Sequence, residues 1–207
     1  MSRDTREFIK LLEPHYNDAL RYSRALCASW SPDDAEDVLQ QSFLQALENF
    51  SSLKDDFKFK SWFFKIITRV FYSSVRKHFW KKFLPLDDES AIPEMPGVFE
   101  NPEMNAEGEA LYKALGKLSS KERAAILLFE IAEFSIEEIK AIQNERSISA
   151  VKSRLSRVRA KLRKYLTEPS NKRLQPLVKK DNQSNGASIG DLEYETIKLI
   201  TEIRAEK

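Results

Sequence analysis

The spacing of apolar residues predicts helices along most of the chain. In residues 5–29, apolar side chains recur at the interval that places them on one face of an α-helix. Pro14 is expected to break or bend this segment, because proline lacks the N–H group that a helix interior needs. With five glycines and no sustained alternation of apolar and polar positions, the pattern argues against a β-sheet. We therefore expect an essentially all-α chain.

Residues 31–50 are predicted to form a helix with two different faces. It begins at Ser31, Pro32 and Asp33, where a hydroxyl cap, a proline and an acidic first turn make a strong helix start. The residues expected to be buried are Leu39, Phe43, Ala46, Leu47 and Phe50. The residues that lie toward the other faces are Asp37, Gln40, Gln41 and Leu44. From the pattern alone, this second side would simply be solvated.

Residues 57–83 hold the densest group of aromatic residues in the chain. The apolar residues are too many for one narrow stripe, so part of the set must be core, and packing alone would account for Phe63, Ile66, Ile67 and Val70. In the second half, rings alternate with cations: Arg69, Tyr72, Arg76, Lys77, His78, Phe79, Trp80, Lys81 and Lys82. Cations that follow phosphates and rings that stack on unstacked bases bind single-stranded DNA. We predict such contacts here, and leave open which rings make them.

Residues 84–110 differ sharply in charge from what precedes them. From Leu84 to Glu109 the chain carries acidic residues and prolines but no lysine or arginine. Prolines and like charges keep a segment extended and unable to form a core of its own. We predict an acidic flexible linker that joins an N-terminal domain (1–83) to a C-terminal domain (111–167). A solvated tether and a segment that occupies a cationic channel are equally compatible with this composition.

The C-terminal domain shows the pattern of a helix-turn-helix. Ser119 and Ser135 each precede a glutamate by three residues, and this capping box opens a helix. A turn follows around 144–146, where Asn144 can adopt the left-handed conformation in place of glycine. A basic helix over 147–166 comes next. A short helix, a tight turn and a basic helix form a helix-turn-helix, whose second helix enters the major groove of DNA.

The basic helix has an unusual cross-section. No acidic residue lies between Arg146 and Thr167. Opposite the apolar stripe, the centre holds the small residues Ser149, Ser153, Ser156 and Ala160. The two flanks hold the cations Lys152, Arg154, Arg157, Arg159, Lys161, Arg163 and Lys164. A slim centre with cationic edges suits a helix placed between two phosphate backbones, although a solvated surface helix is the plain alternative.

The sequence after the basic helix is predicted to form a tail. Residues 168–207 are predicted to be a flexible tail whose segment 191–204 forms a short amphipathic helix, and we hypothesise a regulatory role for it.

The net charge of the chain is only +2, so the distribution of charge is informative and the total is not. Cys27 is the single cysteine, which rules out an intramolecular disulfide. We expect no signal peptide, membrane span, metal site, cofactor or catalytic motif.

Three stretches resemble one known family. "LSSKERAAILLFEIAEFSIEEIKAI" with "SAVKSRLSRVRAKL" resembles the C-terminal DNA-binding region of sigma factors of the extracytoplasmic-function type. "AEDVLQQSFLQAL" is similar to the helix with which these factors dock on the clamp coiled coil of RNA polymerase. "FKSWFFKIITRVFYSSVRK" resembles their promoter-melting helix. The chain departs from the family at Gln41, Arg69 and Ser73, where glutamate, asparagine and aspartate are common, and in a longer turn before the basic helix.

The resemblance implies a sigma factor that binds core RNA polymerase and promoter DNA in the cytoplasm, is controlled by an anti-sigma factor and is not an enzyme. The implied polymerase contacts are Asp37, Gln40, Gln41 and Leu44. The implied contacts to the −10 element during melting are Trp62, Arg69, Tyr72, Arg76, Lys77 and Trp80. The implied contacts to the −35 element are Ser149, Lys152, Ser153, Arg154, Ser156 and Arg157.

Two other functions compete with this one. A conventional helix-turn-helix repressor or activator would bind an operator duplex tightly without polymerase. A sigma-like decoy would bind anti-sigma proteins in place of promoters, but a decoy has no use for so many cations on one helix.

Overall fold

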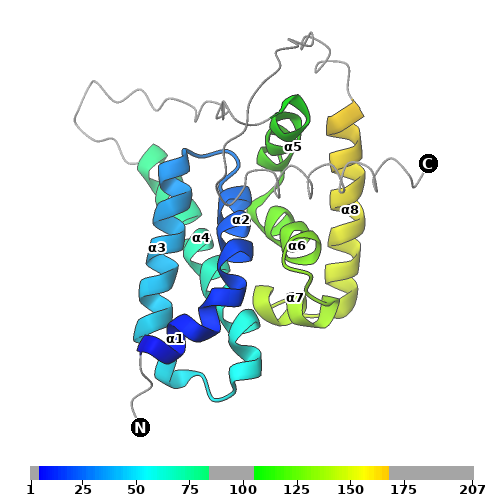
Figure 1. Cartoon of the computed structure of the whole chain (residues 1–207). Helices are drawn as coiled ribbons and strands as arrows, with labels where there is room; N and C mark the ends of the chain where they lie inside the picture. The colour runs from blue at the N-terminus through cyan, green and yellow to red at the C-terminus, as the bar shows by residue number, and fades with distance from the viewer. Residues whose placement is uncertain (1–4, 84–104, 168–207) are drawn as a thin grey trace, which may run out of the picture.

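The computed structural model describes residues 5–83 and 105–167, which are helical and contain no strand (Figure 1). Side chains are described for these residues except Pro32 and residues 79–83. The helices are α1 (Thr5–Leu12), α2 (Tyr16–Leu26), α3 (Pro32–Glu48), α4 (Phe59–Phe83), α5 (Ala106–Gly116), α6 (Ser120–Glu130), α7 (Ile136–Gln143) and α8 (Ile148–Thr167). Short 3₁₀ turns lie at Glu13–His15, Phe50–Ser52 and Asp56–Lys58. The predicted all-α fold is confirmed.

The N-terminal helices begin and end where the sequence signals place them. Pro14 lies in the 3₁₀ turn that separates α1 from α2, so the expected break is present. Ser31 caps α3 through a reciprocal pair of bonds: its Oγ accepts from the Asp34 backbone N–H, and its own N–H donates to the Asp34 carboxylate. These contacts satisfy amide groups that the first turn of a helix would otherwise leave unpaired.

Aromatic rings fill the centre of α1–α4. Phe8 packs edge to face on Phe50, with ring centroids 5.3 Å apart, and Tyr22 contacts Phe64 at the same centroid distance. Three of the four residues that packing alone would account for are buried: Phe63, Ile67 and Val70. Phe59 and Phe64 are buried beside them. Ile66 is only half-buried. Most of the described aromatic side chains of α4 therefore belong to the core.

One residue of the core predicted for α3 was placed wrongly. Leu39, Ala46 and Phe50 are buried, and Phe43 is half-buried, but Leu47 is 40% exposed. At 100° per residue, Leu47 lies about 80° around the helix from Leu39, at the edge of the buried stripe. It therefore faces outward, toward the side that carries Leu44.

The C-terminal helices form the predicted helix-turn-helix. Ser119 and Ser135 cap α6 and α7 in complete capping boxes with Glu122 and Glu138. Asn144 ends α7 with φ 53° and ψ 47°, the left-handed conformation expected of it. α5 begins at Ala106, inside the range predicted to be linker, with Asn105 as its cap. The acidic residues of that range at Glu107 and Glu109 lie in the first turn of α5, where negative charge is favourable.

The two groups of helices pack against each other. α6 contacts α2, and both α6 and α7 contact α4, so the C-terminal helices lie along one side of the N-terminal group (Figure 1). Buried apolar residues from both groups form one continuous core. The sequence pattern predicted two domains but not this contact between them. The predicted linker, up to residue 104, and the predicted tail helix (191–204) lie outside the described residues.

Candidate nucleic-acid and polymerase interfaces

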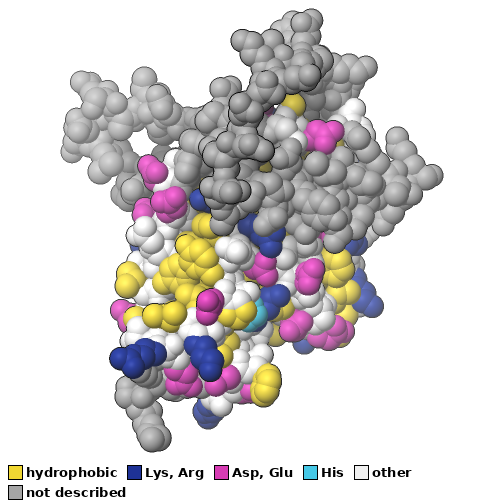
Figure 2. Space-filling view, viewed as in Figure 1, with side chains coloured by type: hydrophobic (Ala, Val, Ile, Leu, Met, Phe, Trp, Pro, Cys, Tyr) yellow, Lys and Arg dark blue, Asp and Glu magenta, His cyan; other side chains and the backbone are white. Residues whose placement is uncertain are grey.

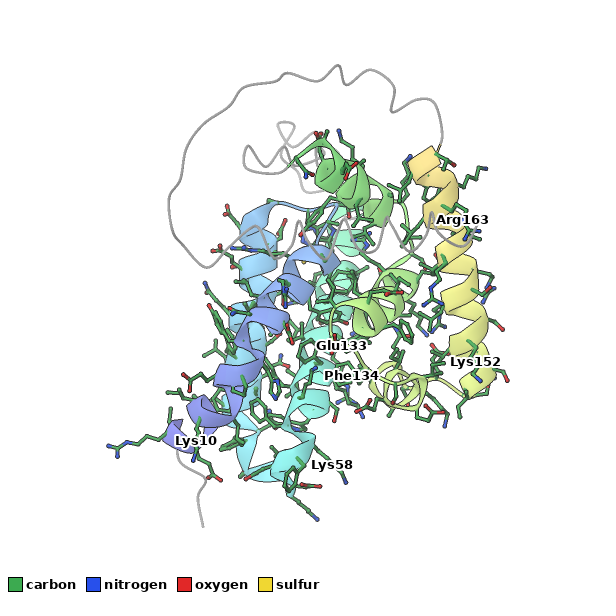
Figure 3. All side chains as sticks on the ribbon, turned by 45° about the vertical axis from the view of Figure 1, so that its right-hand side comes forward. Lys10, Lys58, Glu133, Phe134, Lys152 and Arg163 are labelled. Carbon is green, nitrogen blue, oxygen red and sulfur yellow. The ribbon has the colours of Figure 1, made fainter. Side chains whose placement is uncertain are left out.

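α8 is fixed to the C-terminal domain by its apolar stripe. Val151, Leu155, Val158 and Leu162 are all buried against α5, α6 and α7. On the opposite side, five of the predicted −35 contacts are exposed: Ser149, Lys152, Ser153, Ser156 and Arg157. Figure 3 shows Lys152 on the outer side of α8. The structure therefore brings these five residues together on one accessible surface with small side chains at its centre.

Arg154, the sixth predicted contact, has protein partners. Its side chain is 15% exposed, and its guanidinium donates to Gln143 Oε1 and to Glu145 Oε1, each at 2.8 Å. Burial by itself would raise the pKa of Glu145, but the bonds and charges of Arg154 and Lys121 outweigh it and hold that pKa below its ordinary value. Arg154 thus joins α8 to the turn that precedes it.

Two further cations of α8 are paired with acids of α6. Arg159 lies 3.0 Å from Glu130, and Lys161 lies 2.7 Å from Glu122, the glutamate that also completes the cap of α6. Sequence reasoning missed these pairs, because the acidic residues lie outside the basic helix and reach it only through the fold. The cationic surface is therefore narrower than the sequence indicated, and Lys152 and Arg157 are its exposed members close to the small centre.

The predicted −10 contacts on α4 divide into two sets. Arg69, Arg76 and Lys77 are exposed and can approach phosphates. Trp62 is half-buried beside Phe59, with ring centroids 5.8 Å apart. The side chain of Trp80 lies outside the described ones.

Tyr72 points toward the C-terminal domain. Its hydroxyl accepts a 3.1 Å hydrogen bond from Gln143 Nε2, and burial raises the pKa of the phenol well above its ordinary value. In this arrangement the hydroxyl of Tyr72 is engaged by protein, whereas the cations of α4 are exposed.

The predicted polymerase contacts lie on an exposed face of α3. Asp37, Gln40 and Gln41 are exposed, and Leu44 is 56% exposed. Two further exposed apolar side chains lie on or beside this helix: Leu47, on α3 itself, and Tyr16, whose ring stacks on that of Phe43 with centroids 6.0 Å apart. Figure 2 shows hydrophobic side chains gathered over the region of α1–α3. An exposed apolar surface with polar residues beside it is typical of a protein-binding site.

One further aromatic residue was missed by sequence reasoning. Phe57 is fully exposed in the 3₁₀ turn directly before α4, and its backbone N–H is held by Asp55 Oδ1 at 3.1 Å. Lys58 next to it is exposed. The signal was available, because the segment Phe57–Lys58–Phe59–Lys60 alternates rings with cations just ahead of the melting helix. Phe59 is buried and Phe57 is not, which the alternation alone does not show.

Two classes of site are not found in the described part of the chain. Residues 5–83 and 105–167 contain no group of three His, Cys, Asp or Glu residues that could hold a metal ion. Over the same residues, no helix combines the length and apolar character that crossing a membrane would require.

A helix-turn-helix with an exposed basic surface, packed against an aromatic-rich helical domain, defines a two-domain DNA-binding protein. The family model described as sigma-70 region 2 matches residues 11–81, and the model described as sigma-70 region 4 matches residues 108–162. The chain belongs to the sigma-70 family of RNA polymerase sigma factors, in its extracytoplasmic-function group.

Individual relatives agree with this assignment. The chain is 31% identical to RNA polymerase sigma factor SigV of Bacillus subtilis, over 66% of this chain and 78% of that protein. It is 31% identical to the ECF sigma factor EcfG of Rhodopseudomonas palustris, over 67% of this chain and 74% of that one. Among solved structures, the sigma factor RpoE of Bartonella quintana, in complex with the anti-sigma factor NepR, matches with a TM-score of 0.61 and 27% identity. That match covers 78% of this chain and 98% of the other.

Membership gives the chain its function. It is a sigma factor that binds core RNA polymerase and directs promoter-specific initiation of transcription. The region 2 domain serves the −10 element, and the helix-turn-helix of region 4 serves the −35 element.

Proposed function

We propose which residues of this chain contact the −35 element, the polymerase and the −10 element. The −35 element is bound by the exposed surface of α8: Ser149, Lys152, Ser153, Ser156 and Arg157. The observation that carries this proposal is the shape of that surface, in which small side chains lie between exposed cations on a helix fixed by its buried stripe. Small central residues let the helix approach the base edges, while cations at the sides contact phosphates. Arg154 stays in the proposed set as a residue that orients α8 and lies next to the groove.

The polymerase is bound by the face of α3. We assign the contact to Asp37, Gln40, Gln41 and Leu44, and extend it to Leu47 and Tyr16. Apolar residues supply most of the free energy of such a contact, and the polar residues around them set its orientation. An anti-sigma factor is a second proposed partner, because the similar RpoE of Bartonella quintana was solved in complex with one.

Promoter melting is assigned to α4 and the turn before it. The cations are Arg69, Arg76 and Lys77, and the predicted rings are Trp62, Tyr72 and Trp80. We add Phe57, whose ring is fully exposed and can stack on an unpaired base. The domains implied are 1–83 and 111–167, with α5 extending the second one toward residue 106. The chain acts in the cytoplasm as a factor without catalytic activity of its own.

A run-off transcription assay tests the proposal. Purified chain and core polymerase are incubated with fragmented genomic DNA, and promoter-specific transcripts are mapped. The double variant K152A/R157A is expected to lower their yield on the order of tenfold or more, because two cations at the groove are lost. The matched control is K10A/R24A, which removes one exposed lysine and one exposed arginine of the N-terminal domain outside all of the proposed contacts and leaves the yield unchanged.

The same assay separates the competing functions. Tight binding to an operator duplex without polymerase would support a repressor or activator. Capture of an anti-sigma factor without any transcript would support a decoy.

A further inference from the structure

The exposed side of α8 is longer than the surface assigned to the −35 element. Beyond Arg157, its exposed residues are Ala160, Lys161, Lys164 and Thr167. Most of these continue the row of small residues at intervals of three or four, so they face the same way as that row. The helix has 20 residues and is therefore about 30 Å long.

A helix of this length cannot lie in the major groove throughout. The groove is about 12 Å wide and curves around the duplex, whereas α8 runs straight (Figure 1). In a helix-turn-helix, the N-terminal residues of the second helix contact the base edges. From Ser149 to Arg157 the helix rises about 12 Å, which is enough for that contact. The turns after Arg157 therefore leave the groove and pass the phosphate backbone beside it.

The C-terminal end of α8 is rich in cations. Lys161, Arg163 and Lys164 lie in its last two turns. Figure 3 shows Arg163 near the opposite end of the helix from Lys152. Lys117, the exposed residue that ends α5, places its ammonium group 5.0 Å from the centre of the Tyr165 ring of α8. Because α8 itself contains no acidic residue, the end that leaves the groove is positively charged.

The sequence directly after α8 is basic as well. Residues 168–180 carry one acid, Glu168, and four cations, which are Lys172, Arg173, Lys179 and Lys180. The rest of the tail, 181–207, carries six acidic residues and three basic ones. Charge that served solubility alone would not need to change sign along the tail. The positive charge is concentrated in the part that joins α8, which we call the basic segment (168–180).

The basic segment is long enough to reach DNA beyond the part of the groove that α8 occupies. An extended chain spans at most about 3.6 Å per residue. Lys172 therefore lies within about 18 Å of Thr167, the last residue of α8, and Lys180 lies within about 47 Å of it. Phosphates follow one another every 3.4 Å or so along each strand. This reach covers the phosphates of about one turn of duplex beside the −35 element.

We propose that the basic segment and the C-terminal turns of α8 form a second DNA-binding site, which contacts the phosphates of the duplex next to the −35 element. The proposal rests on the function assigned above, since it requires α8 to lie at that element. Phosphate contacts carry no sequence information, so this site adds affinity and does not select the promoter. Base selection stays with the exposed surface of α8 between Ser149 and Arg157.

The salt dependence of promoter binding tests the proposal. Core polymerase carrying the full chain is titrated onto a fluorescent promoter fragment at several KCl concentrations. K172A/R173A/K179A is expected to weaken binding on the order of tenfold. The slope of log K against log salt should become shallower by about two to three, because each lost phosphate contact contributes about 0.9. The matched control is K198A/R204A/K207A, which removes three cations from the distal part of the tail and leaves affinity and slope unchanged.

A second fragment, in which the −35 sequence is replaced, separates phosphate contact from base reading. K172A/R173A/K179A is expected to weaken binding to both fragments by the same factor. Hydroxyl-radical footprinting of the natural complex should show protection next to the −35 element that is absent with the variant. A loss confined to the fragment with the natural −35 sequence would overturn the proposal, and so would an unchanged footprint.

The remaining outcomes also decide the matter. An unchanged salt slope would overturn the proposal, and so would an equal loss in the control variant, which would assign the effect to the charge of the whole tail. Weaker binding of K172A/R173A/K179A to core polymerase without DNA would overturn it too, because the segment would then contact protein. If the natural complex does not distinguish the two fragments, the function assigned to α8 fails, and the salt slopes still decide whether the basic segment binds DNA.

Discussion

Arg154 is held by two neighbours, and this sets it apart from the other proposed −35 contacts. It lies on the basic helix, as the sequence shows, yet its guanidinium is bonded to Gln143 and Glu145. Lys152 lies on the same helix and is exposed. Two cations that look equivalent in sequence therefore contribute to different properties of the molecule.

Substitutions of Arg154 and Lys152 should have different effects on the free energy of unfolding. R154A is expected to lower the free energy of unfolding by about 1–2 kcal/mol, because Glu145 and Gln143 lose a charged partner. K152A should change it by less than about 0.5 kcal/mol and still reduce promoter binding. Urea unfolding, together with binding of polymerase–sigma complex to a promoter fragment, measures both. Equal stability of the two variants would show that the contacts of Arg154 contribute nothing.

Glu145 makes this contact dependent on pH. Its pKa is held below the ordinary value of 4.5, so the folded state binds the proton more weakly than the unfolded state does. The stability it contributes is therefore complete above about pH 5 and is lost as the pH falls through the folded pKa. E145Q should be less stable than the natural chain near neutral pH, and the difference should shrink in acid. Urea titrations at several pH values test this. A difference that grows in acid would mean that the pKa of Glu145 is raised in the folded state and not lowered.

At the scale of the element, α3 shows how one helix can be core on one side and docking surface on the other. Leu39 and Ala46 are buried, while Leu44 and Leu47 on the other side are exposed. Leu44 and Leu47 are not needed for the core of the domain, because they lie outside it. We expect a partner surface to cover these exposed apolar side chains.

L44D/L47D should abolish binding to core polymerase with little loss of stability. Both side chains are substantially exposed, so a charge there costs little in the free chain but must be desolvated in the complex. A141D adds one such charge at an exposed position of α7 and serves as the control. Pull-down with core polymerase measures binding, and thermal unfolding measures stability. Binding by L44D/L47D at the natural level would place the docking surface elsewhere.

At the scale of the whole molecule, the shared core couples the two domains. Buried residues of α2 and α4 are continuous with those of α6 and α7, and Arg123 and Gln143 connect them. Two domains with a shared buried interface unfold together if the interface contributes enough free energy to couple them.

Calorimetry should show this coupling. The natural chain is expected to unfold in one transition. F134S/Q143A should show two, one for each domain, because Phe134 packs on Phe64 of α4 and Gln143 donates to Tyr72 of the same helix. Two transitions in the natural chain would mean that the interface is too weak to couple the two domains.

Local structure was largely predictable because its causes are local. The capping boxes at Ser31, Ser119 and Ser135 depend on residues three positions apart, and Asn144 adopts the left-handed conformation for reasons confined to one turn. The buried stripe of α8 follows from the 3.6-residue period. The start of α5 was hidden, because its acidic first turn has the same composition as the linker before it.

The candidate surfaces were predictable only in part. The five exposed residues of the −35 set share one helix face, so periodicity alone groups them. Tyr72 and Arg154 also lie at the expected helical positions, but their partners come from α7 and from the turn after it. Phe57 was missed because nothing local distinguishes it from the buried Phe59.

The sequence by itself determined the helices, their caps, the turn of the helix-turn-helix and the family, because these depend on spacing and on short-range contacts. Only the tertiary structure decided which cations of α8 are paired, that Leu47 faces outward, and that Tyr72 meets Gln143. Those outcomes depend on contacts between residues far apart in the chain, such as Arg123 and Leu26. The pattern within one helix contains no information about which distant helix will face it, so the packing of the two domains against each other became visible only in three dimensions.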